Sequence, residues 1–472
     1  MIGDHVAGLD SLNSFNPQTL SNTAWAFASA EVPHPELLRK IGDHIAGQMS
    51  LISFEPQNLS NTAWAYAAAG DLDSFDPKVL SITAWAFATA GVSHDELFKK
   101  IGNHVTGPGG LGSFKPQDLS NTIWAFATAG VLHPELFNMI GHHVAELGSL
   151  DSFKAQALSN TAWALATAGV SHPELFNKIG NHIAGLGSLD SFKPQELSNT
   201  LWACASVCYT DERLFSALAP VIASKLDKCS EQDLANVAWA YSVANTPRQD
   251  LFDEGYVSAL ASNENEFSGK ELAQLHQWQL WQQELESRIE LQGPFQAKCR
   301  NAFTSRGYSE SKLQNDVVDE LKAAGLVLDE EVLLGSGYLI DALVEFNDGR
   351  KVAVEVDGPS HFIDRRPAGR TILKHRQVAK MDHIKVVSVP YWEWDELKNS
   401  EMKQRYLREK LSNGQFEVFQ SQDLSAHVGP SQEPKNKRRL VFPAVLFLSP
   451  MHGHLLHLVE HGLDLEVVGL FP

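Results

Sequence analysis

Three acidic residues in the C-terminal part of the chain are spaced so that they could act together. Asp341 lies in a stretch of alternating apolar residues, and Glu355 and Asp357 lie in a second such stretch beyond the loop Asn-Asp-Gly. A three-residue loop with glycine in the left-handed conformation joins two antiparallel strands. The resulting register sets Asp341 opposite Glu355, with Asp357 diagonal to them on the same face.

Carboxylates that converge on one face of a sheet repel one another, so such a face indicates a bound metal ion, a cationic partner or a shared proton. Hard oxygen ligands suit Mg²⁺, which would activate water for phosphodiester cleavage. The alternative is a solvated sheet edge whose carboxylates form salt bridges with Arg365, Arg366, Lys374 or Arg376. The residues alone leave both interpretations open.

The elements around these carboxylates alternate between helix and strand periods. The pattern predicts helices at 311–324, 371–380 and 394–411, and strands at 338–346, 351–357 and 384–389. In the two strands of the hairpin the even-numbered residues, such as Val344 and Val354, are apolar and should face the core. We therefore expect a small α/β domain at 311–412.

The first half of the chain is a repeat built around the pattern L-S-N-T-x-W-A. Its tryptophans are Trp25, Trp64, Trp85, Trp124, Trp163, Trp202 and Trp239, most of them 39 residues apart and one pair 21 apart. A period of about forty residues fits two helices and two loops per unit. In one unit, apolar spacing predicts helices at 156–169 and 172–186. We expect an all-α solenoid over residues 1–250.

The repeat has two irregular places. The 21-residue step omits the second helix of a unit between Ala69 and Leu72, which predicts a local irregularity in the stack. Met1 lies inside a second-helix pattern, because M-I-G-D-H-V-A-G aligns with the segment from Lys40 to Gly47. We expect the chain to lack its natural N-terminus, so a missing targeting peptide carries no information about its compartment.

Equivalent asparagines recur in the first helix of each unit, with Ile82 replacing one of them. They are Asn22, Asn61, Asn121, Asn160, Asn199 and Asn236. They form either a hydrogen-bonded ladder or a row that reads RNA bases, as in repeat proteins that take one base per repeat. Near-identity of the repeats argues against a rich base code. For the recurring histidines, such as His133 and His172, packing and capping are favoured over metal binding.

Composition limits the remaining functions. A 472-residue chain with 43% hydrophobic residues is not wholly disordered, and no apolar run is long enough to cross a membrane. Four cysteines without paired spacing do not form a disulfide framework or a zinc ribbon. The net charge of −19 opposes nonspecific attraction to nucleic acid, so any contact with RNA must be local.

Two further segments complete the organisation. Residues 251–310 are polar and helix-prone, and we expect a helical cap or connector there, because an end repeat must cover its apolar side. Residues 413–472 are expected to be a poorly ordered tail.

Four consecutive blocks in the C-terminal half carry a family resemblance. The run R-K-V-A-V-E-V-D-G-P-S-H-F, then G-R-T-I-L-K-H-R, V-V-S-V-P-Y-W-E-W and Y-L-R-E-K-L, resembles the RAP domain, an RNA-binding module. The upstream repeats are similar to the helical repeats that precede RAP domains in octotricopeptide-type and FAST-kinase-like proteins. The resemblance implies organellar RNA metabolism, namely the stability, processing or translation of mitochondrial or plastid transcripts or rRNA, with no cofactor required.

RAP domains are in turn similar to restriction-endonuclease-like folds. Asp341, Glu355, Asp357 and His361 match the motif of an Asp before E-x-D-G-x-x-H. The PD-(D/E)xK signature has lysine where this chain has Asp357, so Lys374 would have to reach in from the following helix. The resemblance thus implies either a nuclease, with Asp341, Glu355, Asp357 and Lys374 catalytic and the three acids binding Mg²⁺, or a groove that kept RNA binding and lost catalysis.

Cations followed by aromatic residues supply phosphate contacts and stacking surfaces. The candidate RNA-binding residues of this domain are His361, Arg365, Arg366, Arg370, Lys374, Arg376, Tyr391, Trp392 and Trp394. A charged helix flank around a small aromatic core is the alternative.

We expect a multidomain RNA-binding factor, with an all-α helical-repeat solenoid followed by a small α/β restriction-endonuclease-like domain. A metal-dependent RNA endonuclease and a protein-interaction scaffold without RNA binding are the alternative functions.

Overall fold

The computed structural model of the protein describes residues 2–30, 77–89, 95–107, 111–305 and 311–412, with single positions at 34, 36–38, 40–41, 44, 62 and 65. The chain divides into a unit at Met1–Pro434 and a second at Lys435–Pro472. Three predictions lie outside the described residues: the disordered tail at 413–472, the irregularity between Ala69 and Leu72, and the place of Asn61 in its row.

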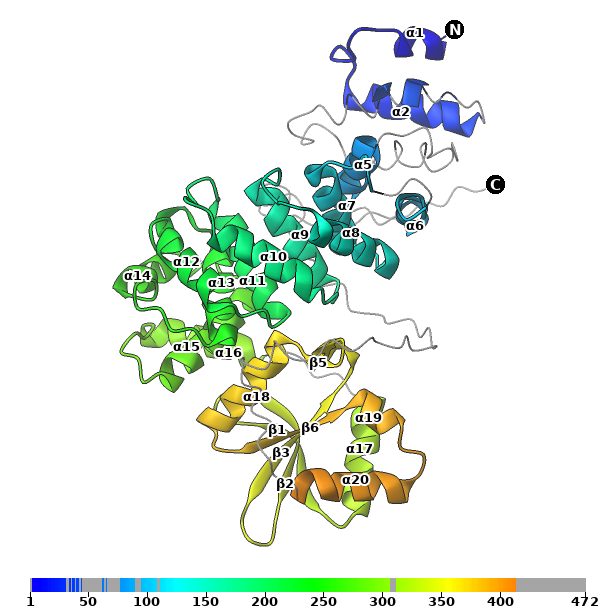
Figure 1. Cartoon of the computed structure of the whole chain (residues 1–472). Coiled ribbons are helices and arrows are strands. Elements are labelled where there is room, and N and C mark those ends of the chain that lie inside the picture. Colours follow the sequence, from blue (N-terminus) through cyan, green and yellow to red (C-terminus); the bar gives the residue numbers. More distant parts are fainter. Residues whose placement is uncertain are drawn as a thin grey trace, which may run out of the picture. The chain divides into compact units, whose positions relative to one another are not determined.

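Paired helices build the N-terminal half of the first unit (Figure 1). The first helices of the pairs, here called A helices, are α2 (Pro17–Ser29), α5 (Pro77–Thr89), α7 (Pro116–Thr128), α9 (Ala155–Thr167), α11 (Pro194–Ser206) and α13 (Glu231–Ala244). The second helices, or B helices, are α1 (Ile2–Ala7), α6 (Asp95–Val105), α8 (Pro134–Glu146), α10 (Pro173–Ala184), α12 (Glu212–Ala223) and α14 (Glu254–Ser262). From α5 onward, A helices pack on A helices, and the B helices from α6 to α12 pack on one another, so the predicted repeat of two helices is confirmed.

A histidine that precedes α8 and another that precedes α10 join each of these B helices to the one before it. The Nδ1 atom of His172 accepts a hydrogen bond from the backbone N–H of Leu175 at 3.2 Å. The Nε2 atom therefore carries the hydrogen and donates to Nδ1 of His142 in the preceding B helix, at 3.3 Å. A Cβ on Gly141 would lie 2.7 Å from the ring, so glycine makes the room. His133 makes the equivalent contacts, and the recurring histidines are thus capping and packing residues.

Two further helices, α15 (Gly269–Glu284) and α16 (Gly293–Thr304), follow the last pair. Trp278 and Trp281 of α15 are fully buried, as expected of a segment that covers the end of the stack. A short 3-10 helix at Leu226–Lys228 connects two of the earlier helices. No helix in the described ranges combines the length and apolar character needed to span a membrane.

A four-stranded sheet forms the centre of the C-terminal α/β domain. Its order is β1 (Val327–Leu333), β2 (Leu339–Glu345), β3 (Lys351–Asp357) and β6 (Lys385–Pro390), with β3 and β6 parallel and the other pairs antiparallel. The helices are α17 (Lys312–Ala323), α18 (Gly369–Met381), α19 (Tyr391–Asp395) and α20 (Ser400–Ser412). A 3-10 turn (Pro359–His361) leads into a small hairpin of β4 (Phe362–Ile363) and β5 (Arg366–Pro367).

The register of the hairpin matches the prediction, because Glu345 pairs with Lys351 and Ala342 with Val354. Strand β1 was not predicted. Its sequence, V-L-D-E-E-V-L, breaks the apolar alternation, and it occupies the edge of the sheet, where most of its residues are exposed or half-buried.

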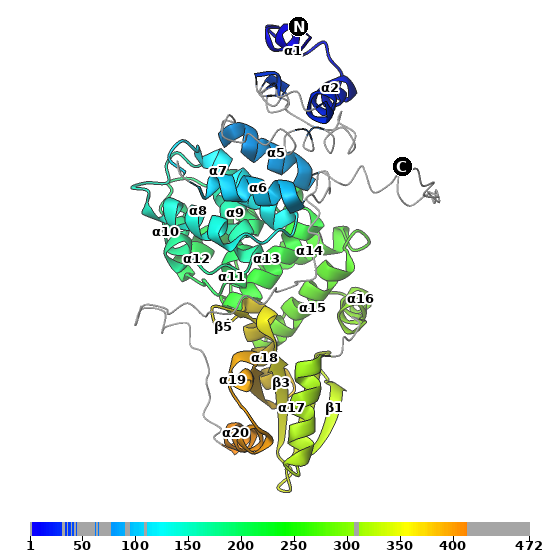
Figure 2. The same cartoon turned by 90° about the vertical axis from the view of Figure 1, so that its right-hand side faces the viewer.

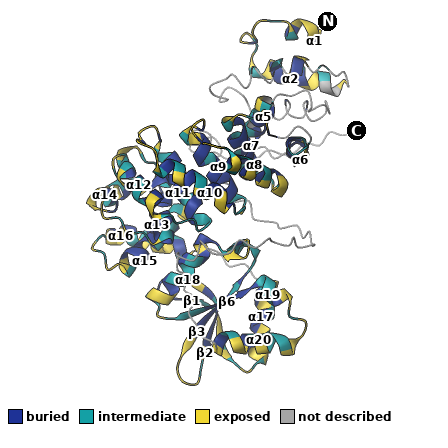
Figure 3. Ribbon diagram, viewed as in Figure 1, coloured by how far each residue is buried: buried dark blue, intermediate teal, exposed yellow. Residues whose placement is uncertain are grey.

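Both faces of the sheet are buried. Ala342, Val344 and Val354 pack with α17 and α20, as the alternation predicted. The opposite face, expected to be polar, is buried as well, because Leu343 and Ala353 pack in a second core with residues of α15 and α18. Figure 3 shows the inner strands as buried. The face that carries the carboxylates therefore lies under a helix instead of in solvent.

Helix α18 lies between the sheet and the ends of the A helices (Figure 2). On its repeat side, Arg376 forms an ion pair with Glu284 at 3.1 Å and donates to the backbone carbonyls of Val243, at 3.2 Å, and Ser242. Those carbonyls end α13, and a cation at a helix C-terminus is favoured by the helix dipole. Gln377, fully buried, accepts from the Tyr338 hydroxyl and donates to the carbonyl of Gln277, which ties the domain to α15.

The first residue of α18 is in close contact with the repeats. A Cβ built on Gly369 would lie 2.1 Å from the carbonyl oxygen of Ala205, at the end of α11. Only glycine fits this approach without movement of the backbone.

Substitution of Gly369 by alanine should therefore weaken the packing of the α/β domain on the repeats. We expect a loss of roughly 1–3 kcal/mol in the free energy of unfolding, measured by urea denaturation of the full chain. Gly293→Ala is the matched control, because Gly293 also begins a helix but a Cβ there meets nothing within 4 Å. Equal effects of the two substitutions would contradict this account of Gly369.

Candidate functional site

Glu355 and Lys374 form a buried ion pair at the centre of the carboxylate face. Glu355, 1% exposed, comes from β3, and its Oε2 atom lies 2.6 Å from Nζ of Lys374 on α18. Asp341 of β2 is on the same face, and its Oδ2 accepts a hydrogen bond from the backbone N–H of Val356 at 2.6 Å. Lys374 thus reaches the carboxylate face from the helix.

Asp357 has a separate set of partners at the end of β3. Its Oδ1 lies 2.7 Å from Nδ1 of His361, and its Oδ2 accepts from the hydroxyl of Ser388 on β6. His375 of α18 approaches to 3.7 Å. Asp357 itself is 1% exposed, whereas the His361 side chain is 36% exposed, so His361 connects this carboxylate to solvent.

These environments shift the pKa values of the three acids in different directions. Burial raises the pKa of Glu355 to about 8, against the nearby charge of Lys374, which lowers it. Burial also raises the pKa of Asp341. For Asp357, burial alone would raise the pKa, but the hydrogen bond from His361 and the neighbouring imidazoles outweigh it, and the pKa is lowered. Glu355 is therefore the acid that holds a proton most readily.

The three acids do not fit a bound divalent cation in this arrangement. Their oxygens are not gathered into one ligand set among the residues that the structure describes. Glu355 is held by Lys374 and Asp357 by His361, so each of these two carboxyl groups already has a partner within the protein. The carboxylates as they stand hold the sheet and α18 together, and Mg²⁺ binding by Asp341, Glu355 and Asp357 stays a prediction.

An aromatic and cationic surface lies beside the carboxylates. The rings of Phe362 and Trp392 are 4.2 Å apart in an edge-to-face contact, and Tyr391 lies 5.2 Å from Trp392. The guanidinium of Arg365 is 5.8 Å from the centre of the Trp392 ring. We call Phe362, Arg365, Tyr391 and Trp392 the Trp392 cluster. Its rings are half-buried and its arginine is exposed, so bases and phosphates have access to it.

Arg366 is also exposed, on the same small hairpin. Arg370 donates to the backbone carbonyl of Ser360, just before that hairpin. The hairpin in turn contacts the repeats, since the Cys208 thiol donates to the carbonyl of Pro367 at 3.1 Å.

Two predicted RNA-binding residues have structural positions instead. Trp394 is 2% exposed in the core of the α/β domain, and its indole N–H donates to Asp316 at 2.8 Å, so its ring cannot stack on a base. Arg376 is engaged with Glu284 and with the end of α13. Both predictions were wrong for one reason: the sequence shows residue types but not that α18 and α19 each turn one side inward.

The asparagine row is present on the A helices. Asn22 is exposed and Asn121, Asn160 and Asn199 are half-buried, and no hydrogen bond joins these side chains to any residue in the described ranges. Asn236, in contrast, is buried and accepts from Gln274 of α15 at 3.1 Å. The ladder interpretation therefore holds at the C-terminal end of the row, whereas three central amides are free for a ligand.

Tryptophans accompany these asparagines one turn further along each helix. The Trp124 and Trp163 rings are 6.3 Å apart, as are those of Trp202 and Trp239. Asn121 and Trp124 lie three residues apart on one helix face, away from Phe126, which contacts the B helix residue Phe98. Amides and indoles thus form adjoining rows on the side of the A helices that is turned away from the B helices.

A row of lysines, missed from the sequence, borders these residues. Lys115, Lys154 and Lys193 are exposed and occupy the N-cap positions of α7, α9 and α11. A cation is unfavourable at a helix N-terminus, which already attracts anions. The recurring S-F-K-x-Q segments of the sequence carry this signal within repeats whose net charge is acidic.

One group of potential metal ligands does occur, at His142, His172 and Glu174. His172 uses Nδ1 to cap α10 and donates through Nε2 to His142, so it has no lone pair left for a metal. These residues belong to the joint between repeats.

Comparisons with known proteins agree with this arrangement. The family model of the RAP domain matches residues 354–410, which include the second half of β3, the hairpin of β4 and β5, α18, β6, α19 and most of α20. The chain contains a RAP domain. The model of the RNA-editing substrate-binding complex 6 protein matches residues 75–264, in the repeats. A RAP domain-containing protein, chloroplastic, from Oryza sativa subsp. japonica is 26% identical over 195 residues, which cover 39% of this chain and 30% of the rice protein.

The RAP domain and the match of the repeats together indicate a function that involves RNA. In the RAP domain an exposed cation, Arg365, lies near the ring of Trp392, an arrangement suited to contacts with RNA.

The buried pair of Glu355 and Lys374 predicts a pH effect on stability. Because the pKa of Glu355 is about 8 in the folded protein and near 4.5 in an unfolded chain, folding is favoured by the proton and weakens as pH rises from 4.5 to 8. Glu355→Gln should therefore gain roughly 4 kcal/mol relative to wild type between pH 5 and pH 8.5, measured by urea denaturation.

Glu345→Gln serves as the control for this substitution, because Glu345 lies on the neighbouring strand but is exposed beside Lys351. A Glu355→Gln curve parallel to wild type across this pH range would show that Glu355 is ionised in the folded state.

Proposed function

We propose that this protein is an RNA-binding factor that acts in the processing, stability or translation of organellar transcripts. The observation that carries the proposal is the set of adjoining rows on the A helices: exposed lysines at the helix N-termini, then unbonded asparagines, then tryptophans. Each row repeats in register with the stacked helices, as a single-stranded polymer of regular spacing requires.

The lysines are suited to phosphate groups. Each stands at a helix N-terminus, where the helix dipole adds to its positive charge. The buried carboxylates of Asp118 and Glu196 accept from the backbone N–H of Lys115 and Lys193, which leaves the ammonium groups at the surface. This arrangement supplies local positive charge on a chain whose net charge is −19.

The asparagines and tryptophans are suited to bases. An amide can donate and accept along a base edge, and the half-buried indoles of Trp124 and Trp202 provide a surface for stacking, whereas Trp163 and Trp239 are buried. Since the repeats present the same residues, each would contact its base in the same way. We therefore infer weak sequence discrimination within the central repeats, and a second set of contacts through the Trp392 cluster.

The organellar part of the proposal has independent support. The rice relative is named as chloroplastic, and the family matched by the repeats is named for an RNA-editing complex. A protein-interaction scaffold would also use a solenoid, but it gives no reason for cations at helix N-termini.

Replacement of Lys115, Lys154 and Lys193 by glutamine should weaken binding of single-stranded RNA and reduce its dependence on salt. The slope of log affinity against log salt should fall by about 2, because each phosphate contact on a single strand contributes about 0.7. Fluorescence anisotropy with a labelled 20-nucleotide RNA at several salt concentrations measures both.

The control triple Lys99→Gln, Lys228→Gln and Lys312→Gln removes the same charge from exposed positions elsewhere. An equal fall in slope for both triple variants would show that the effect comes from net charge and not from the position of the lysines. No RNA binding by the wild-type chain would leave the scaffold as the better explanation.

Cleavage of RNA stays a prediction of the acidic residues, and the same samples test it. With Mg²⁺ or Mn²⁺ present, we expect the bound RNA to remain intact, because Glu355 is buried and held by Lys374. Cleavage by wild type that both Asp341→Ala and Glu355→Ala abolish would instead establish a nuclease.

A further inference from the structure

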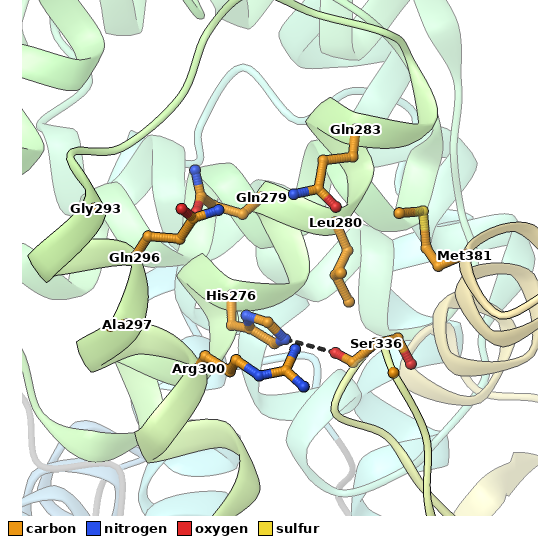
Figure 4. A pocket seen from close by; sticks show the side chains of 11 residues that line it. His276, Gln279, Leu280, Gln283, Gly293, Gln296, Ala297, Arg300, Ser336 and Met381 are labelled. Atoms are coloured by element: carbon orange, nitrogen blue, oxygen red, sulfur yellow. Dashed lines mark hydrogen bonds between the residues drawn. The ribbon is translucent and has the colours of Figure 1, made fainter.

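A pocket of about 370 Å³ lies where α15 and α16 meet the RAP domain (Figure 4). Its lining includes His276, Gln279 and Leu280 of α15, Gln296 and Arg300 of α16, and Met381 of α18. It shares no residue with the rows on the A helices, the carboxylate face or the Trp392 cluster. A volume of this size is in the range of small-molecule sites.

His276 presents an unused hydrogen-bond acceptor to this pocket. Its Nε2 lies 2.8 Å from the carbonyl oxygen of Ser336, and since a carbonyl only accepts, Nε2 carries the hydrogen. Nδ1 is then a lone-pair acceptor. The residue is 5% exposed and stacks on Phe303 at 4.8 Å, which fixes the ring, and Nδ1 has no partner among the described residues.

Gln279 presents a second acceptor one turn along the same helix. It is 3% exposed, and its Oε1 has no hydrogen-bond partner in the described part of the chain. Positions three apart lie on the same side of a helix. A buried acceptor without a donor costs about 1–3 kcal/mol, so two of them in one pocket indicate a ligand that brings N–H groups.

The other side chains that line the pocket indicate the shape of that ligand. Leu280 and Met381 offer apolar side walls against which a flat ring can pack. Figure 4 shows the amide of Gln283 directed toward the same space, with Arg300 beside His276. Arg300 is exposed, and its guanidinium forms no ion pair with a described residue, so it remains available to a phosphate at the rim.

We propose that this pocket binds one unstacked nucleotide of RNA whose base carries an exocyclic amino group, with adenine or cytosine preferred to uracil. The amino group donates to Nδ1 of His276 and to Oε1 of Gln279, the base ring packs against Leu280 and Met381, and Arg300 contacts the phosphate. This inference rests on the proposed RNA-binding function and adds a base preference that the near-identical repeats do not supply.

The test uses the full chain with labelled decamers of adenylate, cytidylate and uridylate in fluorescence anisotropy, and with free AMP and UMP in calorimetry. We expect tighter binding of the adenylate and cytidylate decamers than of uridylate. Gln279→Leu, which keeps the size of the side chain but removes the acceptor, should weaken the first two by five- to tenfold and leave uridylate unchanged.

Gln282→Leu is the matched control, because Gln282 is a buried glutamine of the same helix that does not line the pocket. Thermal unfolding of both variants shows whether either change affects the fold. Equal weakening by both variants would overturn the proposal.

The outcomes separate this inference from the proposed function. If the chain binds the decamers but Gln279→Leu changes nothing, the pocket does not read RNA and the proposed function stands. If AMP binds and is lost in Gln279→Leu while decamer binding is unaffected, the pocket takes a free nucleotide and the proposal for RNA is wrong. If no decamer and no 20-nucleotide RNA binds, the proposed function itself fails.

Discussion

The two-sided packing of α18 is the constraint on which the C-terminal half of the molecule depends. One side of the helix places Lys374 and His375 against the acids of β3, and the other places Arg376 on the end of α13. Gly369 permits the approach, because any larger residue would meet the carbonyl of Ala205. The RAP domain and the end of the repeats are therefore one packed structure.

This packing explains why the acidic residues resemble an active site and yet are buried. A nuclease of this kind needs its carboxylates open to a metal ion and a phosphodiester. Here α18 and the repeats cover the face, and the carboxylates are stabilised by lysine and imidazole in place of a metal ion. The accessible side chains of this part of the domain lie at its edge, where His361, Arg365 and Trp392 reach solvent.

Local features of the fold could be predicted from the sequence, whereas contacts between distant segments could not. The period of the tryptophans identified the paired helices, and the Asn-Asp-Gly loop fixed the register of β2 and β3. The alternation of apolar residues placed Val344 and Val354 in the core. It did not show that Leu343 and Ala353 would be covered by α15 and α18, since the α15 residues Ala273 and Leu280 lie more than 60 residues away in sequence.

In the candidate site, too, residues placed by local pattern could be predicted, whereas residues placed by tertiary contacts could not. Asp341, Glu355 and Lys374 were predicted to share a site and do lie together, because strand register and one helix decide their positions. Trp394 and Arg376 were assigned to RNA by type, and both are held by tertiary contacts that no local pattern reveals. A fragment cut at residue 311 would expose the apolar face of Leu343, so the RAP domain is best studied within the whole chain.

The joints between B helices use different side chains along the stack, with histidine at some joints and tyrosine at another. At His133 and His172 the ring accepts through one nitrogen and donates through the other, which only the neutral imidazole can do. At the next joint Tyr209 lies against Gly180 in place of a histidine, and burial raises the pKa of its phenol. Protonation of His172 would break the joint between α8 and α10, because an imidazolium has no lone pair for the N–H of Leu175, whereas the Tyr209 contact contains no imidazole to protonate.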